Sequence, residues 1–266
     1  MSQRDSVAGK WALVTGASSG FGVEFATLLA EQRANLILVA RRREPMEKLA
    51  ERLRRERGVT VVIETMDLSV PDAATALKAR TDAQGLAVDM LINNAGFGLY
   101  GEFVGQPLAR VMNMLRLNIL SLTELTHLYG CDMARRGSGH ILVTASLLGF
   151  QGVPGYAAYA ASKAYVLHFG EALHTELRSR GVVVTVLAPG AATTSFGDVA
   201  GQTDKGTLQR LMMSPRAVAE IGMRALLRRR SSVVAGWRNG FIVFLNRFTP
   251  RALQRQIFKR VMAGEV

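Results

Sequence analysis

The sequence contains one cysteine, Cys131, which excludes a disulfide within the chain and fits a reducing compartment such as the cytoplasm. It lacks an apolar run of the ~18–20 residues that a membrane-spanning helix requires, and the longest late run covers only residues 241–245. No signal peptide is expected, because residues 1–6 contain no apolar stretch. Contents of 48% apolar and 20% charged residues exclude a disordered, collagen-like or coiled-coil chain.

Acidic residues are scarce toward the C-terminus. The net charge is +12, yet residues 1–204 hold 20 Lys/Arg against 19 Asp/Glu. Residues 205–266 hold 13 Lys/Arg against only two acids, Glu220 and Glu265. A basic excess confined to one end favours an anionic surface or ligand near that end, and no nucleic acid is expected as a partner.

Short runs rich in β-branched residues alternate along the chain with amphipathic stretches. Strands are predicted at residues 11–15, 36–40, 59–66, 90–92, 140–144, 182–187 and 232–235. Helices are predicted at residues 21–34, 45–57, 72–83, 108–117, 120–136, 156–180 and 215–229. The alternation predicts a doubly wound, Rossmann-like α/β fold, with a parallel sheet of about seven strands and helices on both faces. We expect one domain over residues 1–236 and a basic, amphipathic helical tail over residues 237–266.

A glycine-rich turn follows the first predicted strand and opens the first helix. Its glycines allow the backbone to approach a pyrophosphate, and the helix N-terminus supplies free N–H groups. The spacing is Gly-x3-Gly-x-Gly, which differs from the common dinucleotide fingerprint, so a tight turn without a ligand remains an alternative. The candidate cofactor-binding residues of this turn are Gly16, Ser18, Ser19, Gly20, Phe21 and Gly22.

Tyr159 and Lys163 stand four residues apart near the start of a predicted helix and therefore share one face. An ammonium group beside a phenol lowers the pKa of the phenol, which suits it to proton transfer near neutral pH. Ser146 ends the fifth predicted strand and can hydrogen-bond a carbonyl oxygen. Alone, the Tyr-x3-Lys pair could equally lie on the surface, and the turn at 93–96, Asn-Asn-Ala-Gly, could be only a turn.

Taken together and in this order, these elements resemble the ordinary branch of the short-chain dehydrogenase/reductase family, from about residue 10 to residue 227. Asn118 and the Pro-Gly-x3-Thr element Pro189, Gly190 and Thr194 also match. The segment after the last predicted strand departs from the Asp-Gly-Gly-like pattern of many members. This departure puts in doubt the usual C-terminal packing and any tetramer built on it.

The resemblance implies hydride transfer between a nicotinamide cofactor and a carbonyl or alcohol. It implies Tyr159 as proton donor or acceptor, Ser146 as the group that polarises the substrate oxygen, Lys163 on the nicotinamide ribose, and Asn118 in a proton relay. Asp67 would contact the adenine and Thr194 the carboxamide. The other cofactor contacts that the resemblance implies are Asn94, Ala95, Gly96, Pro189 and Gly190.

The residues near position 40 predict which cofactor is used. NAD-binding members of such folds place an acid about twenty residues past the glycine turn. Here Arg41 and Arg42 occupy that region, and the first carboxylate is Glu44. Arginines suit a 2′-phosphate, which predicts NADP(H), although a solvated cluster at a helix start is the alternative.

We therefore expect an NADP(H)-dependent oxidoreductase that interconverts a carbonyl and an alcohol on a lipophilic small molecule or acyl substrate. The alternative is a non-catalytic NADP-binding sensor or scaffold on the same fold. Apolar residues expected to line the substrate side are Phe97, Leu99, Leu147, Leu148, Phe150 and Val153. No metal site is expected, because His168 and His174 diverge on their helix.

The remaining expectations concern the oligomeric state, the loop 191–214 and the C-terminal tail. A homodimer through helices 120–136 and 156–180 is implied by the resemblance. The loop 191–214 is long enough to be a functional lid. Phe241, Phe244, Leu245 and Phe248 form a helical stripe. That stripe either packs on the domain or a second subunit, or makes a peripheral membrane contact through 237–266.

Overall fold

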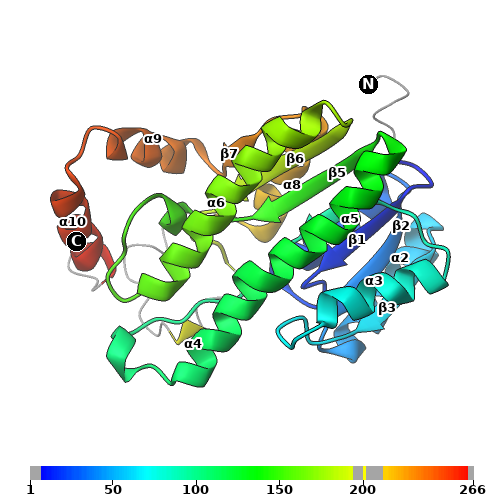
Figure 1. Cartoon of the computed structure of the whole chain (residues 1–266), viewed down its shortest axis with the longest axis horizontal. Coiled ribbons are helices and arrows are strands. Elements are labelled where there is room, and N and C mark those ends of the chain that lie inside the picture. The colour runs from blue at the N-terminus through cyan, green and yellow to red at the C-terminus, as the bar shows by residue number, and fades with distance from the viewer. Residues whose placement is uncertain (1–6, 194–199, 202–211, 263–266) are drawn as a thin grey trace.

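A single parallel sheet forms the centre of the computed structural model, which describes residues 7–193, 200–201 and 212–262. Its strand order is β3-β2-β1-β4-β5-β6-β7, with helices on both faces (Figure 1). The strands are β1 (Trp11–Thr15), β2 (Asn35–Ala40), β3 (Val61–Thr65), β4 (Val88–Asn93), β5 (Gly139–Thr144), β6 (Val182–Ala188) and β7 (Ser232–Val234). The sequence-based prediction of a doubly wound, seven-stranded Rossmann-like fold is confirmed.

Alternate residues of the buried strands face two separate apolar cores. Leu36 and Leu38 of β2 pack with α1 (Gly20–Glu31), α2 (Arg43–Arg57) and α8 (Pro215–Leu227). Ile37 and Val39 of the same strand point the other way. The helices on that second face are α3 (Ala73–Ala83), α5 (Leu122–Arg136) and α6 (Ala157–Arg178). Burial on both faces explains why these strands read as continuous apolar runs.

The segment between β4 and β5 contains one irregular helix. A π-helical turn, Arg116–Ser121, joins α4 (Leu108–Leu115) directly to α5. The sequence predicted two separate helices at 108–117 and 120–136, and the structure corrects this to one continuous helical path (Figure 1). A π-turn contains an extra residue, which changes the direction of the side chains within it. Here the turn directs Asn118 toward the edge of the sheet.

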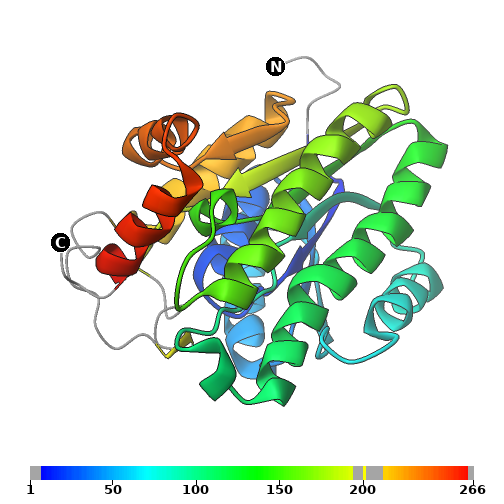
Figure 2. The same ribbon diagram turned by 60° about the vertical axis from the view of Figure 1, so that its left-hand side comes forward.

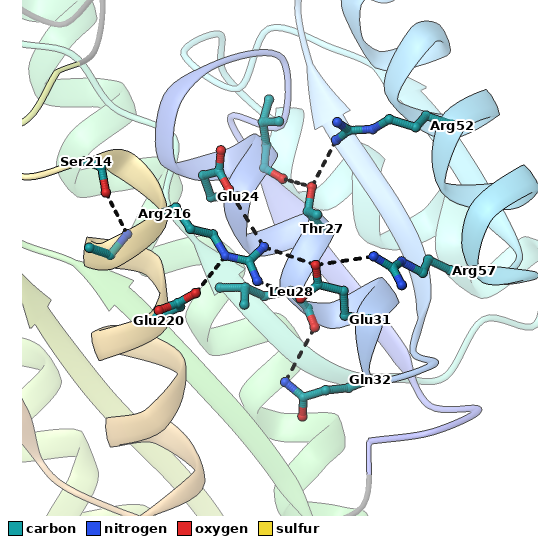
Figure 3. A network of polar contacts seen from close by, with 12 residues as sticks. Glu24, Thr27, Leu28, Glu31, Gln32, Arg52, Arg57, Ser214, Arg216 and Glu220 are labelled. Carbon is teal, nitrogen blue, oxygen red and sulfur yellow. Dashed lines mark hydrogen bonds and ion pairs between the residues drawn. The ribbon is translucent and has the colours of Figure 1, made fainter.

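An ion-pair network fixes α8 to α1 across the first face (Figure 3). Arg216 Nη2 lies 2.7 Å from Glu31 Oε2, and Arg216 Nε donates to Glu220 Oε1 at 2.8 Å. Arg57 of α2 reaches the same Glu31 carboxylate at 3.5 Å. The neighbouring carboxylates hold the pKa of Arg216 above its ordinary value. One charged cluster thus joins α8 to α1 and α2, which lie far from it in the sequence.

Two helices follow β7 and lie at the end of the molecule opposite β3 (Figures 1 and 2): α9 (Trp237–Asn246) and α10 (Arg251–Met262). They correspond to the predicted helical tail, and the division of the chain into domains at residue 236 stays a prediction. None of the described helices combines the length and apolar character needed to cross a bilayer.

Candidate active site

The glycine-rich turn between β1 and α1 is tied to the end of β4. Gly16 has φ +70°, and a Cβ on Gly22 would lie 2.1 Å from the Gly16 carbonyl oxygen, so both positions require glycine. Thr15 Oγ1 accepts hydrogen bonds from the Asn94 and Ala95 amides, each at 2.9 Å. No side chain caps the start of α1, and its first turn holds no acid. The turn therefore offers a backbone cradle for an anion.

Two arginines and one carboxylate lie beside this cradle. Arg42 Nη2 donates to the Ser18 carbonyl oxygen and to Ser18 Oγ, both at 3.2 Å. Arg41 Nη1 lies 3.9 Å from Asp67 Oδ2, and Ser69 donates to Asp67 Oδ1 through both its amide and its hydroxyl. Burial raises the pKa of Asp67, but the Ser69 hydrogen bonds and the Arg41 charge outweigh it and hold that pKa below its ordinary value. The predicted cofactor residues Ser18, Arg41, Arg42 and Asp67 thus lie at one edge of the sheet.

Asn118, Lys163 and Gly96 meet at the carboxyl end of the sheet. Lys163 Nζ donates to the Thr144 carbonyl oxygen at 2.7 Å. Asn118 Nδ2 donates to the Phe97 carbonyl oxygen at 3.0 Å, and Asn118 Oδ1 accepts from the Phe97 amide. A Cβ on Gly96 would lie 2.8 Å from Asn118 Oδ1 and 3.4 Å from Lys163 Nζ. A larger side chain at position 96 would therefore displace both groups.

Tyr159 lies one helical turn before Lys163, and its phenol is hydrogen-bonded to the side chain of Ser146. Ser146 also caps the short helix Leu147–Phe150, because its Oγ accepts from the Leu148 amide at 3.2 Å. Both side chains are buried, at 5% exposure for Tyr159 and 8% for Ser146. The structure thus brings together Asn118, Ser146, Tyr159 and Lys163, which the sequence named from separate segments.

The prediction that Lys163 lowers the pKa of Tyr159 is wrong for this arrangement. Burial raises the pKa of Tyr159 above its ordinary value, the Ser146 hydrogen bond opposes that rise, and nearby Tyr156 adds to it. Burial also lowers the pKa of Lys163 to about 8. Lys163 Nζ lies 5.9 Å from the centre of the Tyr159 ring, and its hydrogen bond goes to Thr144 instead. The phenol consequently holds its proton at neutral pH.

The Pro-Gly element after β6 is placed only in part. The Leu147 amide donates to the Pro189 carbonyl oxygen at 2.8 Å, which joins this element to the Ser146 segment. A Cβ on Gly190 would lie 2.5 Å from Asn239 Nδ2 of α9. Thr194 lies outside the described residues, as does most of the predicted lid at 191–214. The lid's described ends pair with each other, since the Thr193 amide donates to Met213 and the Met213 amide to Ala191.

An apolar cluster packs around Tyr159. It contains the expected wall residues Leu99 and Val153, with Phe97 and Leu148 at its edge. Phe150 instead packs against the core under α6. Val111 of α4 and Phe258 of α10 also belong to the cluster, with Ile242 of α9 at its edge, and these were not among the expected wall residues. Only the helical periodicity of these segments marked them as apolar faces, and periodicity does not say which partner a face meets.

Residues 10–205 match a family model described as short chain dehydrogenase. The chain belongs to the short-chain dehydrogenase/reductase family. This family comprises oxidoreductases that interconvert hydroxyl and keto groups with an NAD(P) cofactor, and its solved members hold NADP in some cases and NAD in others.

Several relatives place the chain within this family. It is 30% identical to the ketoacyl reductase HetN of Nostoc sp., over 86% of this chain and 79% of that protein. It is 32% identical to human 17-beta-hydroxysteroid dehydrogenase type 3, over 71% of this chain but only 61% of that longer protein. A short-chain dehydrogenase from Sphingobium yanoikuyae, solved with NADPH, superimposes with a TM-score of 0.79 at 29% identity, over 91% of this chain and 97% of the other.

Proposed function

We propose that this short-chain oxidoreductase uses NADP(H) to interconvert a carbonyl and an alcohol on a lipophilic substrate. The observation that carries the proposal is the assembly of Ser146, Tyr159, Lys163 and Asn118 at the carboxyl edge of the sheet, next to the glycine turn. Ligands of doubly wound sheets bind at this edge, because the strand ends and helix N-termini open there.

The proton chemistry follows from the burial of Tyr159. In the reductive direction a nicotinamide cofactor, when bound, would supply a hydride for the carbonyl carbon. The carbonyl oxygen then gains negative charge, and Ser146 and Tyr159 donate hydrogen bonds to it. Tyr159 gives its proton to that oxygen, so the product is a neutral alcohol and the phenolate must be reprotonated. Lys163, held on the Thr144 carbonyl oxygen, is the residue that would hold the nicotinamide ribose, and Asn118 holds the Phe97 loop in place beside Lys163.

The cofactor preference is proposed from Arg41 and Arg42. The cradle of Gly16 and Gly22, with the uncapped start of α1, fits a pyrophosphate. Arg42 donates to Ser18 of that cradle, and this neighbourhood supports Arg42 as a partner of a ribose 2′-phosphate. A carboxylate that would repel the phosphate is absent from positions 40–43, and the Glu44 carboxylate instead pairs with Lys48 at 2.7 Å.

The lipophilic substrate is proposed from the apolar cluster beside Tyr159. Leu99, Met114, Val153 and Phe258 pack in the cluster around Tyr159 and give it apolar surroundings, which offer few polar partners to a sugar or a small acid. Relatives named as a ketoacyl reductase and as a hydroxysteroid dehydrogenase agree with an apolar substrate. We also propose a homodimer through α5 and α6, because Leu120 of the π-helical turn before α5 and Tyr165 of α6 are exposed at 56% and 38%. Cytoplasmic localisation stays a prediction.

The test is a panel of ketones and aldehydes with NADPH, followed by the loss of cofactor absorbance. The panel pairs each long-chain or polycyclic ketone with a short or hydroxylated analogue of the same carbonyl type. We expect kcat/KM to rise with apolar surface. Tight NADPH binding without turnover of any member would favour the sensor or scaffold alternative, and a preference for polar analogues would exclude the lipophilic pocket.

A further inference from the structure

The helices α9 and α10 are attached to the domain by a few inward residues. Asn239 is buried and donates to the Ala235 carbonyl oxygen, and Asn246 Nδ2 donates to Gln151 Oε1 at 2.8 Å. Ile242 and Phe258 join the apolar cluster around Tyr159. Gln254 Nε2 donates to the carbonyl oxygens of Asn246 and Thr249, which fixes α10 to the end of α9. The pair therefore forms a helical corner (Figure 2) that packs on the apolar cluster around Tyr159.

The opposite side of this corner is apolar and exposed. Trp237 and Phe248 are 79% and 73% exposed, and Phe241 and Phe244 are 56% and 52% exposed. Leu253 and Ile257 continue the apolar surface on α10, where they are four residues apart. The stripe that the sequence identified is therefore not what packs on the domain. Monomeric proteins seldom leave so many large apolar side chains uncovered without a partner.

The charge around this apolar surface has one sign. Residues 221–262 contain no Asp or Glu. The exposed cations of α9, α10 and the turn between them are Arg238, Arg247, Arg251, Arg255, Lys259 and Arg260. Aromatic side chains beside a basic surface are typical of helices that lie in the interface of an anionic bilayer, where the rings enter the headgroup region and the cations meet lipid phosphates.

We propose that α9 and α10 dock the enzyme on an anionic lipid surface. A second copy of this chain would bring the same cations against each other, so the uniform positive charge favours lipid over self-association. The inward side of the same helices packs into the apolar cluster around Tyr159 through Ile242 and Phe258. A lipophilic substrate would thus pass from the bilayer to Tyr159 along the corner. This delivery step rests on the proposed function, whereas docking does not.

The experiment is co-sedimentation of the full chain with vesicles of phosphatidylcholine alone or mixed equally with phosphatidylglycerol. We expect binding to the mixed vesicles that weakens as salt rises, and little binding to phosphatidylcholine. Replacing Phe241, Phe244 and Phe248 by Ser should abolish binding. Replacing Arg247, Arg251 and Lys259 by Gln should weaken it by at least about tenfold.

A matched control removes the same charge elsewhere. Arg55→Gln, Arg178→Gln and Arg180→Gln remove three exposed arginines outside α9 and α10 and should leave vesicle binding within about twofold of wild type. NADPH affinity and turnover of a water-soluble carbonyl should be unchanged in every variant, which separates docking from a failure of the proposed function.

Three outcomes would overturn the proposal. The first is wild-type protein that does not bind the mixed vesicles at low salt. The second is an Arg55/Arg178/Arg180 control variant that loses binding as strongly as the Arg247/Arg251/Lys259 variant. The third is a Phe→Ser variant that dissociates a dimer in size-exclusion chromatography while vesicle binding is absent throughout, which would assign the surface to a subunit contact.

Discussion

Lys163 Nζ donates a 2.7 Å hydrogen bond to the main-chain carbonyl of Thr144, the last residue of β5. The bond ties the helix that carries Tyr159 to the strand end that Ser146 follows by two residues. Donor and acceptor are both buried, so the bond forms in a region of low dielectric where it is strengthened. The positions of Ser146 and Tyr159 relative to each other therefore depend on Lys163 before any ligand is bound.

Tyr159→Phe should lower kcat by ~10²–10⁴ while NADPH affinity stays near that of wild type, because the ring still packs and only the proton donor is lost. The measurement is steady-state turnover beside a fluorescence titration of the cofactor. Tyr156→Phe is the matched control, since its ring lies 5.8 Å from that of Tyr159 and is equally buried. If the two variants exchanged these phenotypes, Tyr156 would be the proton donor.

Lys163 should make stability rise with pH. Its pKa is about 8 in the folded protein against 10.5 ordinarily, so between these values the unfolded chain binds the proton and the folded chain does not. The free energy of unfolding of wild type relative to Lys163→Met should therefore increase by up to about 3 kcal/mol across this window, and should be constant below it. Urea unfolding of both proteins at several pH values measures it, and the titration of Tyr159 cancels in the comparison. A pH-independent difference would contradict the burial argument.

NADPH should bind at least about tenfold more tightly than NADH, a gap of ~1.4 kcal/mol. Replacing Arg41 and Arg42 together by Ala should remove most of that gap, because the 2′-phosphate loses its charged partners. Arg43→Gln serves as the control, since its guanidinium is paired with Glu47 at 2.7 Å. Equal affinities of the wild-type protein for the two cofactors would rule out this assignment.

Arg216→Gln should lower the free energy of unfolding by ~1 kcal/mol, discounted for the 35% exposure of the side chain. The loss arises because Glu31 and Glu220 both lose the Arg216 guanidinium, and Glu31 keeps its longer contact with Arg57. Thermal or urea unfolding at low and high salt measures it, and salt should reduce the effect. Arg43→Gln removes an ion pair within one helix and should lower the free energy of unfolding much less. A loss of the same size would show that the ion pairs between α1 and α8 stabilise the fold no more than a pair within one helix does.

Strand and helix positions were largely predictable, and the misses have local causes. The sequence placed β3 at 59–66, yet β2 pairs with it only from Leu36 opposite Val61 to Ala40 opposite Thr65. It placed β4 at 90–92, yet pairing with β1 already begins at Val88 opposite Trp11. Ladder length depends on the neighbouring strand, which local composition does not encode. The π-turn at Asn118 could not be predicted either, because its residue types do not distinguish it from an ordinary helix.

The sequence by itself determined the doubly wound sheet and the glycine turn, because periodicity and motif spacing are local properties of the chain, and its family resemblance named Ser146, Tyr159 and Lys163 as the candidate catalytic residues. Tertiary structure alone decided the protonation of Tyr159, because burial is set by everything that packs around the ring and here outweighs the opposing hydrogen bond from Ser146. It also decided which side of α9 faces out. Helical spacing defines an apolar stripe, but only packing shows that Asn239, Ile242 and Asn246 face the domain while Phe241, Phe244 and Phe248 remain exposed.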